Sequence, residues 1–370
     1  MTDMLVTQRR EKLIGELKSA GGLKVTELAS RLRVSRATVR RDLLDLEAEG
    51  RISRVRGGAL LSTEADAPQA AGEPAVRSAP VAFPVEGEQS LGLLVPSATY
   101  YYPRVVAGVQ AAAARRGARI IISLSDYTQD EDARRIEELA ESGVAGLLIA
   151  SPGGHDLPDA AIRSFESSGL PFVLMERQPQ DPYSACEFVV TDHQQGAYAA
   201  VRHLVGLGHE RVALFTNGSP TADLVAQGHQ AAVEQLCAGR PVPVVDSGRP
   251  SQDRTSAEAH YTRFVDACLA QGVTAALIHS DHDAIEVLRQ LRTRGLRVPE
   301  DMALIAYDDE IAGLADVPLT AVAPPKQELG EQAAHMLLDR LSERGSGLPV
   351  RQTYLQPRLV LRGSTEAVRN

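Results

Sequence analysis

The sequence predicts an α/β protein whose parallel, doubly wound sheets form two lobes, preceded by a small basic domain. From Ser90 onward, short apolar runs alternate with segments of helical periodicity, an order that requires parallel strands joined by crossover helices. This part is roughly 280 residues long, enough for two such lobes. Charge is also segregated, because residues 1–62 hold 13 Lys and Arg against 8 Asp and Glu, whereas the whole chain carries a net charge of −9.

The basic domain, residues 1–61, has the pattern of a winged helix-turn-helix. Residues 25–32 predict a short helix, and only two residues separate it from a second helix that Ser35 caps. Apolar residues recur at i, i+4 and i+7 along one face of the second helix, and Gly50 ends it. Residues 51–58 then predict a strand that runs into a Gly-Gly turn, the start of a hairpin.

The polar face of the second helix carries the residues that we expect to contact DNA. Arginine pairs bidentately with guanine or clamps phosphates, and a helix amino terminus favours a phosphate. A solvated helix face is the alternative, but the tight helix spacing and the segregated charge weigh against it. The predicted DNA-contacting residues are Ser35, Arg36, Ala37, Thr38, Arg40 and Arg41, with Arg54 and Arg56 on the hairpin.

Residues 62–89 predict a linker, because four prolines interrupt an Ala/Glu-rich stretch that cannot bury a core. No apolar run is long enough to span a membrane, and the first residues lack the apolar region of a secretory signal, so we expect a cytoplasmic protein. The three cysteines, Cys186, Cys237 and Cys268, are widely spaced, which favours reduced thiols over disulfides or a metal site.

The third part, residues 90–366, contains ten predicted strands and seven predicted helices. The strands are expected at residues 91–95, 119–123, 145–150, 171–175, 188–190, 211–215, 242–245, 275–279, 302–306 and 353–355. The helices are expected at residues 105–116, 131–142, 196–207, 223–238, 257–271, 282–294 and 328–344. Ligands of such sheets bind at the carboxyl ends of strands, so residues that directly follow strands are candidates for a binding site.

The amino-terminal motifs resemble the DNA-binding domain of the DeoR family of bacterial transcription regulators. The resemblance covers residues 8–61 and implies that the helix beginning at Ser35 is the recognition helix. It rests on Arg9-Arg10, Val25-Thr26-Glu27-Leu28-Ala29, Ser35-x-x-Thr38-Val39-Arg40-Arg41-Asp42-Leu43 and Arg54-Val55-x-Gly57-Gly58-Ala59.

The rest of the chain, residues 90–365, resembles the effector-binding domain of the LacI/GalR repressors, which has the periplasmic-binding-protein fold. The resemblance implies two lobes that close on a small molecule, typically a sugar. It rests on Leu91-Gly92-Leu93-Leu94-Val95-Pro96, Gly206-Leu207-Gly208-His209, Val298-Pro299-Glu300-Asp301, Tyr307-Asp308-Asp309 and Leu361-Arg362-Gly363-Ser364-Thr365.

Candidate ligand-contacting residues follow predicted strands. Asp281 lies between a strand and a helix, where a carboxylate accepts hydrogen bonds from sugar hydroxyls, and it matches the family's ligand-contacting Asp. Its alternative role is to cap that helix, and both roles can hold at once. The three tyrosines after the first strand suggest ring stacking on a ligand, or alternatively a surface turn with one buried ring. The predicted set, with two residues added by the resemblance alone, is Tyr100, Tyr101, Tyr102, Ser151, Gln227 and Asp281.

The chain departs from the LacI/GalR pattern at two ligand-site positions. Val225 stands where the family usually has Arg, and Pro324 replaces a Gln. Either Arg177 or Arg254 substitutes for the missing guanidinium, or the ligand is not a typical pyranose. The segment at residues 279–283, His-x-Asp-His-Asp, is not expected to bind metal, because consecutive residues at a strand–helix junction point apart.

We therefore expect a transcription regulator, a repressor, that binds operator DNA as a homodimer under the control of a small molecule. The expected effector is a carbohydrate, and no cofactor, metal ion or membrane is implied. Because the linker lacks a basic hinge helix, we expect ligand and DNA to be coupled through dimer geometry. The alternatives are a nucleoside or polyol sensor and a solute-binding-type protein without a sugar ligand. No catalytic motif is present, so we predict no enzymatic activity.

Overall fold

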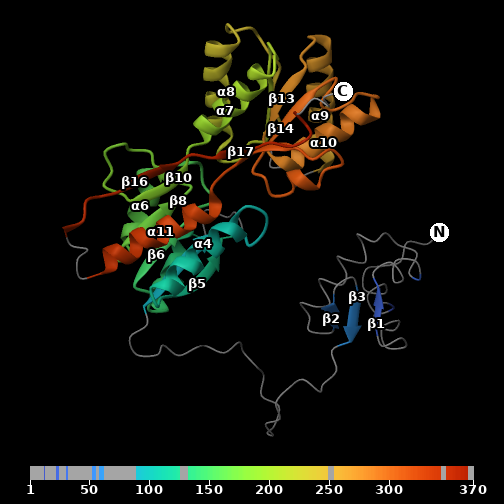
Figure 1. Ribbon diagram of the computed structural model, residues 1–370. Helices are drawn as coiled ribbons and strands as arrows, with labels where there is room; N and C mark the ends of the chain where they lie inside the picture. The colour runs from blue at the N-terminus through green and yellow to red at the C-terminus, as the bar shows by residue number, and fades with distance from the viewer. Residues whose placement is uncertain are drawn as a thin grey trace. The chain divides into compact units, whose positions relative to one another are not determined.

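The structure is a computed structural model of the chain. It describes residues 12, 22–24, 31, 52–55, 58–61, 89–125, 132–248, 254–342 and 347–365. The chain divides into two compact units, Met1–Ala82 and Phe83–Asn370 (Figure 1). The predicted recognition helix and all but the last residue of the predicted linker lie outside the described residues.

The described strands of the first unit form a three-stranded antiparallel sheet in the order β1-β3-β2. β2 (Ile52–Val55) and β3 (Gly58–Leu61) pair antiparallel, which confirms the predicted strand, while the residues that join them lie outside the described part of the chain. β1 (Gly22–Lys24) pairs with β3 and was not predicted, since three residues are too few to show the alternation of a strand.

In the second unit, lobe 1 is built on a parallel sheet in the order β16-β10-β8-β6-β4-β5. Alternate strand residues point to opposite faces, so that α4 (Tyr102–Arg115) and α11 (Lys326–Leu341) cover one face. α5 (Asp132–Glu141) and α6 (Asp159–Glu166) cover the other. The strands are β4 (Ser90–Val95), β5 (Arg119–Leu124), β6 (Gly146–Ile149), β8 (Phe172–Met175), β10 (Phe188–Thr191) and β16 (Gln352–Leu355).

Lobe 2 repeats this design with the strand order β12-β11-β13-β14-β15-β17, in which only β17 is antiparallel to its neighbour. α7 (His193–Gly206) and α8 (Ala222–Leu236) cover one face, and α9 (Arg254–Ala270) and α10 (Asp281–Thr293) cover the other. The strands are β11 (Ala213–Thr216), β12 (Val244–Asp246), β13 (Ala275–Ile278), β14 (Ala303–Tyr307), β15 (Thr320–Ala323) and β17 (Arg358–Val360). Smaller elements are β7 (Asp156–Leu157), β9 (Gln178–Pro179) and the 3-10 helix η3 (Ala312–Leu314).

Both lobes therefore have the doubly wound arrangement that the sequence predicts. In each lobe the first strand lies between the second and the third, as in β5-β4-β6 and β12-β11-β13. The connections leave the first and third strands toward opposite faces, and the place beside their carboxyl ends, where ligands of such sheets bind, is called the crevice. The residues after β4, β6 and β8 border this crevice in lobe 1, and those after β11, β13 and β14 border it in lobe 2.

Within residues 89–365, the described chain passes between the lobes three times: from β10 into α7, from β15 into α11, and from β16 into β17. As a result α11, drawn in orange-red, packs beside α4 although it follows a strand of the other lobe (Figure 1). The two helices approach closely at two glycines. A Cβ on Gly108 would lie 2.0 Å from the main-chain oxygen of Gln327, and one on Gly330 would lie 2.1 Å from that of Val105, so only glycine fits.

All ten predicted strands and all seven predicted helices of this unit are present, with their ends shifted by a few residues. α6, β15 and β17 were not predicted because they are short and lack a clear period. The three cysteines are free and buried, as expected, and burial above all raises the pKa of Cys186 and of Cys268 to about 12. Among the residues that the structure describes, no helix is long and apolar enough to cross a membrane.

Candidate functional site

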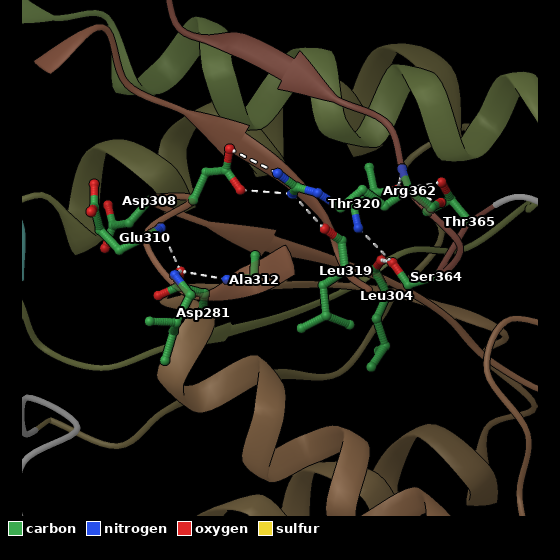
Figure 2. A network of polar contacts seen from close by, with 12 residues as sticks. Asp281, Leu304, Asp308, Glu310, Ala312, Leu319, Thr320, Arg362, Ser364 and Thr365 are labelled. Carbon is green, nitrogen blue, oxygen red and sulfur yellow. Dashed lines mark hydrogen bonds and ion pairs between the residues drawn. The ribbon is translucent and has the colours of Figure 1, made fainter. Parts of the chain in front are cut away.

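Asp281 lies at the carboxyl end of β13, as the first residue of α10, and is fully buried (Figure 2). Its Oδ2 accepts hydrogen bonds from the main-chain N–H groups of Glu310 and Ile311 at 2.7 Å and of Ala312 at 3.1 Å. These bonds hold the loop after β14 against the start of α10. Since Oδ2 has three donors within lobe 2, Oδ1 is the oxygen left to face a partner from elsewhere.

Asp281 is not the cap of α10, which was its alternative role. Ser280 is the N-cap residue, and Oδ2 of Asp283 accepts hydrogen bonds from its main-chain N–H at 3.2 Å and its hydroxyl at 2.9 Å. The helix start is therefore held by a local pair, and the Asp281 carboxylate is available for the loop after β14 and for lobe 1.

The partner of Asp281 from lobe 1 is Tyr100, which follows β4. The Tyr100 hydroxyl donates to Oδ1 of Asp281 and lies 3.1 Å from Oδ2 of Asp308. Its ring centroid is 4.8 Å from that of His282. Burial, followed by the charges of Asp308 and Asp281, raises the pKa of Tyr100 far above its ordinary value. Two of the predicted ligand residues, Tyr100 and Asp281, thus meet across the lobes. Because the pKa of Tyr100 is raised, its phenol is a neutral hydrogen-bond donor.

A second contact between the lobes surrounds Glu176, the residue after β8. Its Oε1 accepts hydrogen bonds from the hydroxyls of Tyr101 and of Thr191, the latter at 2.7 Å, and its Oε2 accepts from the Thr191 N–H at 3.0 Å. Nε2 of His193 lies 3.6 Å from Oε2, and Nδ1 of His193 lies 3.0 Å from the hydroxyl of Tyr307. Burial alone would raise the pKa of Glu176, but His193, Tyr101 and Thr191 together lower it to about 2.

Lys326, at the start of α11, brings a buried cation to the same region. Its Nζ lies 2.9 Å from Oε1 of Glu310, donates to the main-chain oxygen of Asp308 and is 4.7 Å from the ring centroid of Tyr101. Burial raises the pKa of Asp308 to about 6, with the neighbouring Asp281 adding to the shift and Lys326 opposing it. The Asp308 carboxyl therefore changes charge near neutral pH.

The backbone is strained where these side chains meet. Tyr100, Glu176, Asp308 and Asp309 have φ values of 59°, 55°, 88° and 57°, which lie in the left-handed region. This conformation costs a non-glycine residue about 1–3 kcal/mol, and such strain gathers at functional sites. Four of the five described non-glycine residues of this kind border the crevice, so the strain marks the same place as the polar contacts.

The comparisons with known proteins divide the chain in the same way as the structure. Residues 9–65 match the DeoR-like helix-turn-helix domain, and residues 201–365 match the periplasmic binding protein-like domain. The chain joins a DeoR-like helix-turn-helix domain to a periplasmic-binding-protein-like domain.

Two of the similar proteins cover 90% or more of the chain. The arabinose metabolism transcriptional repressor of Geobacillus stearothermophilus is 25% identical over 354 residues, which are 92% of this chain and 90% of that protein. A solved complex of the transcriptional regulator CelR with cellobiose has a TM-score of 0.63 at 24% identity and covers 90% of this chain and 91% of its own. A LacI family regulator from Enterococcus faecium with bound ribose has a TM-score of 0.59 at 24% identity, with 75% and 98% covered. Both solved structures share the fold.

The other predicted ligand residues of the periplasmic-binding-protein-like domain have different partners. Ser151 is buried after β6, and its hydroxyl donates to Oδ2 of Asp132 at 2.6 Å. Tyr102 packs in the core between the sheet of lobe 1 and α4. Gln227 is exposed on α8 and accepts a hydrogen bond from the Gln194 amide of α7 at 2.6 Å. Their contact with a ligand stays a prediction.

The two departures from the LacI/GalR pattern have structural counterparts. Val225 is fully buried and packs in the core beneath α8. Arg177, one of the two proposed substitutes, is buried beside Glu176, and its Nη1 donates to the main-chain oxygen of that residue at 2.7 Å. The side chain of Arg254 lies outside the described residues.

Sequence reasoning missed Glu176, His193, Asp308 and Lys326. Glu176 and Asp308 each come directly after a buried strand, so the rule that pointed to Asp281 applies to them as well. Lys326 is the chain's sole lysine outside the basic domain, which was a usable signal. His193 had none, because its contacts with Glu176 and Tyr307 depend on how the first crossing between the lobes is folded.

The residues predicted to contact DNA fall almost entirely outside the described part of the chain. Arg54 lies in β2, where only the main chain is described. The others are Ser35, Arg36, Ala37, Thr38, Arg40, Arg41 and Arg56.

A hollow of about 790 Å³ lies elsewhere on lobe 2, at the amino ends of β11, β12 and β13. Within it, the guanidinium of Arg211 donates to Gln271 and to the main-chain oxygen of Pro241. The second cation in its wall, Arg240, pairs with Glu210. Both cations therefore already have partners, and the hollow lies at the end of the sheet away from Asp281.

Proposed function

We propose that this protein is a transcriptional repressor that binds operator DNA through its helix-turn-helix domain and responds to a small molecule held between the lobes. The observation that carries the proposal is the union of the two domains in one chain, with a named repressor similar over 92% of its length. The named relatives are regulators of transcription, and no enzymatic activity is proposed. A regulator of this kind acts in the cytoplasm.

On the DNA side, the charge of the helix-turn-helix domain supports the proposal. We infer that Arg40 and Arg41 reach base edges in the major groove, while Ser35, Thr38 and the hairpin arginines hold phosphates. The amino-terminal segment is basic and the rest of the chain is acidic. DNA therefore attracts the first and repels the second.

On the ligand side, the proposed effector is a carbohydrate in the crevice bordered by Tyr100, Tyr101 and Asp281. Oδ1 of the buried Asp281 carboxylate already accepts from one hydroxyl, that of Tyr100, and it can accept from a sugar hydroxyl in the same way. Aromatic rings at the border pack on the apolar face of a sugar. The sugars bound by CelR and by the Enterococcus faecium regulator support the same class of effector here.

We propose that the active form is a homodimer. β5 is an edge strand of lobe 1, and its Ile121 and Ile122 are 37% and 42% exposed, which suits contact with a second copy. A ligand that binds both lobes favours their closed arrangement. In a dimer, closure changes the spacing of the two helix-turn-helix domains and so their fit to two half-sites.

Binding of the purified protein to DNA from upstream of its own gene tests the proposal. Arg40→Ala and Arg41→Ala should abolish specific binding in fluorescence anisotropy, whereas Arg297→Ala, which changes an exposed arginine of lobe 2, should leave it unchanged. If about five arginines contact phosphates, the logarithm of the affinity should fall with the logarithm of salt concentration at a slope near −4 to −5. A slope near zero, or binding that survives both variants, would contradict the assignment.

A further inference from the structure

We propose that the crevice between the lobes selects its ligand by charge: it accepts a compound without negative charge that presents O–H or N–H donors, and it rejects phosphorylated or carboxylated counterparts. The inference rests on the proposed function, because it concerns the ligand of the same crevice. It goes further by naming which compounds the regulator responds to and which it ignores.

The crevice already holds one hydroxyl, that of Tyr100. Oδ1 of Asp281 and Oδ2 of Asp308, both from lobe 2, converge on the single hydroxyl that Tyr100 brings from lobe 1. A hydroxyl at this point donates to one carboxylate and lies within reach of the other, whereas an oxyanion in the same place would face two negative charges without a proton to share. The position is therefore built for a neutral donor.

The behaviour of the tyrosine itself supports this reading. Its ionisation is suppressed by burial and then by Asp308 and Asp281, which is why its pKa is raised so far. The same burial and the same two carboxylates would act on the phosphate or carboxylate of a ligand that replaced the phenol. Burial and the two carboxylates therefore both disfavour an anion at the point that the Tyr100 hydroxyl occupies.

The nearby cations of lobe 1 already have partners. Lys326 and Arg104 both face Glu310, with N–O distances of 2.9 Å and 3.4 Å. Arg177 donates to its neighbour's main-chain oxygen, and its charge helps to oppose the rise that burial causes in the pKa of Asp132. Where the LacI/GalR pattern has an arginine, Val225 is buried in the core. Lys326 and Arg104 share the carboxylate of Glu310, and among the described residues no ion pair joins a cation to the carboxylate of Asp281 or Asp308.

The size of the effect follows from Coulomb's law. An anionic group about 5 Å from one ionised carboxylate, at an effective dielectric constant of about 20, is disfavoured by roughly 300-fold. Screening and rearrangement reduce this figure, so we expect the anionic member of a matched pair of ligands to bind at least ~10-fold more weakly than the neutral member.

Matched pairs of compounds test the proposal on the full chain. Melting temperatures are measured at pH 7.5 with ribose and ribose 5-phosphate, with glucose, glucosamine, glucose 6-phosphate and gluconate, and with arabinose and arabinonate. Dissociation constants for any pair that contains a stabilising compound are then measured by calorimetry. We expect stabilisation only by neutral or amino members.

Two substitutions assign the selectivity to the carboxylates. Asp308→Asn and Glu310→Gln each remove one negative charge at the crevice and should bring the two dissociation constants of a pair closer together. Glu300→Gln, which removes an exposed charge beyond the far end of α10, should leave their ratio unchanged. Because the two test variants change different residues, a folding defect in one leaves the other as a test.

The outcomes separate this inference from the proposed function. Anionic members that bind as tightly as their neutral counterparts would overturn charge selection and leave sugar sensing intact, and loss of that binding in Arg177→Gln would identify the anion's partner. A ratio that Asp308→Asn and Glu310→Gln change no more than Glu300→Gln would also overturn it. If no compound of either charge stabilised the protein, both the inference and the carbohydrate part of the proposed function would fall, while DNA binding would stand.

Discussion

Glu176 in lobe 1 and Asp308 in lobe 2 occupy equivalent places, yet their pKa values move in opposite directions. Each directly follows a central strand, each has a left-handed backbone, and they are only 2% and 8% exposed. The pKa of Glu176 is about 2 and that of Asp308 is about 6. Burial raises both values, so the difference comes from what each carboxylate touches.

The partners explain the contrast. Glu176 accepts from Tyr101 and twice from Thr191, and His193 lies beside it, so its charge is compensated by groups that the fold itself supplies. Asp308 has the hydroxyl of Tyr100 at 3.1 Å, but Asp281 stands next to it and repels it. One carboxylate stabilises the joint between the lobes, and the other is held at a cost in stability, as expected of a group kept for binding.

The strongest test of this contrast is Glu176→Gln. Removing one partner of a buried, hydrogen-bonded charge costs about 3–5 kcal/mol in the free energy of unfolding. Because the folded-state pKa of about 2 lies below the ordinary 4.5, the stabilising contribution is present above pH 4.5 and is lost as the pH falls toward 2. Urea unfolding should therefore show a large loss at neutral pH that shrinks in acid, with the exposed Glu166→Gln as control. A loss below ~1 kcal/mol in the free energy of unfolding would show that the charge of Glu176 is not stabilised by its partners.

The same chemical change in lobe 2 should have the opposite sign. Asp308 has a folded-state pKa of about 6, above the ordinary 3.8, so its contribution to stability is largest below pH 3.8 and is lost as the pH rises through 6. Asp308→Asn, which keeps an acceptor for Tyr100, should raise the free energy of unfolding by about 2–3 kcal/mol at pH 7.5. Urea unfolding at pH 7.5 and pH 4 measures this, and an advantage that does not shrink in acid would refute the cause.

Tyr101→Phe should weaken the contact around Glu176 and so lower the free energy of unfolding. The lost hydroxyl donates to a fully buried, ionised carboxylate, and such a bond contributes about 1.5–3 kcal/mol. The pKa of Glu176 should also rise, since the Tyr101 hydroxyl is one of the groups that lower it. The measurement is the pH at which the acid-dependent part of unfolding begins, which should shift upward. An unchanged onset would show that His193 and Thr191 are enough to keep the pKa of Glu176 low.

Tyr100→Phe is the smallest of the four changes. The hydroxyl links two carboxylates of lobe 2, but its loss is partly offset because Asp308 then takes up a proton more readily, so we expect a cost of about 1 kcal/mol. The pKa of Asp308 should move above 6, since this hydrogen bond lowers it. The difference in unfolding free energy between a protein with Asp308 and its Asp308→Asn variant changes with pH, and the midpoint of this change reports the pKa of Asp308. The midpoint is measured with Tyr100 in place and in the Tyr100→Phe background, and a downward shift in Tyr100→Phe would contradict the geometry.

The residues of the candidate site that could be predicted from the sequence are those with a local signal in the chain. Asp281 was found because it follows a strand and begins a helix, and both neighbours can be read from periodicity. Tyr100 and Tyr101 were found because three tyrosines follow β4, although stacking was expected and hydrogen bonds to carboxylates were found. The same local rule applied to Asp308 would have pointed to the second carboxylate that the Tyr100 hydroxyl approaches.

By itself the sequence determined the succession of strands and helices, the doubly wound class of both lobes and the helix-turn-helix character of the basic end. These follow from short-range patterns of apolar residues and charge, which each segment carries independently of its neighbours. Only the tertiary structure decided that α11 returns to lobe 1, that Tyr100 meets Asp281 and Asp308, and that two similar carboxylates ionise differently. Those outcomes depend on distances between residues far apart in the chain, and a pKa is set by such distances.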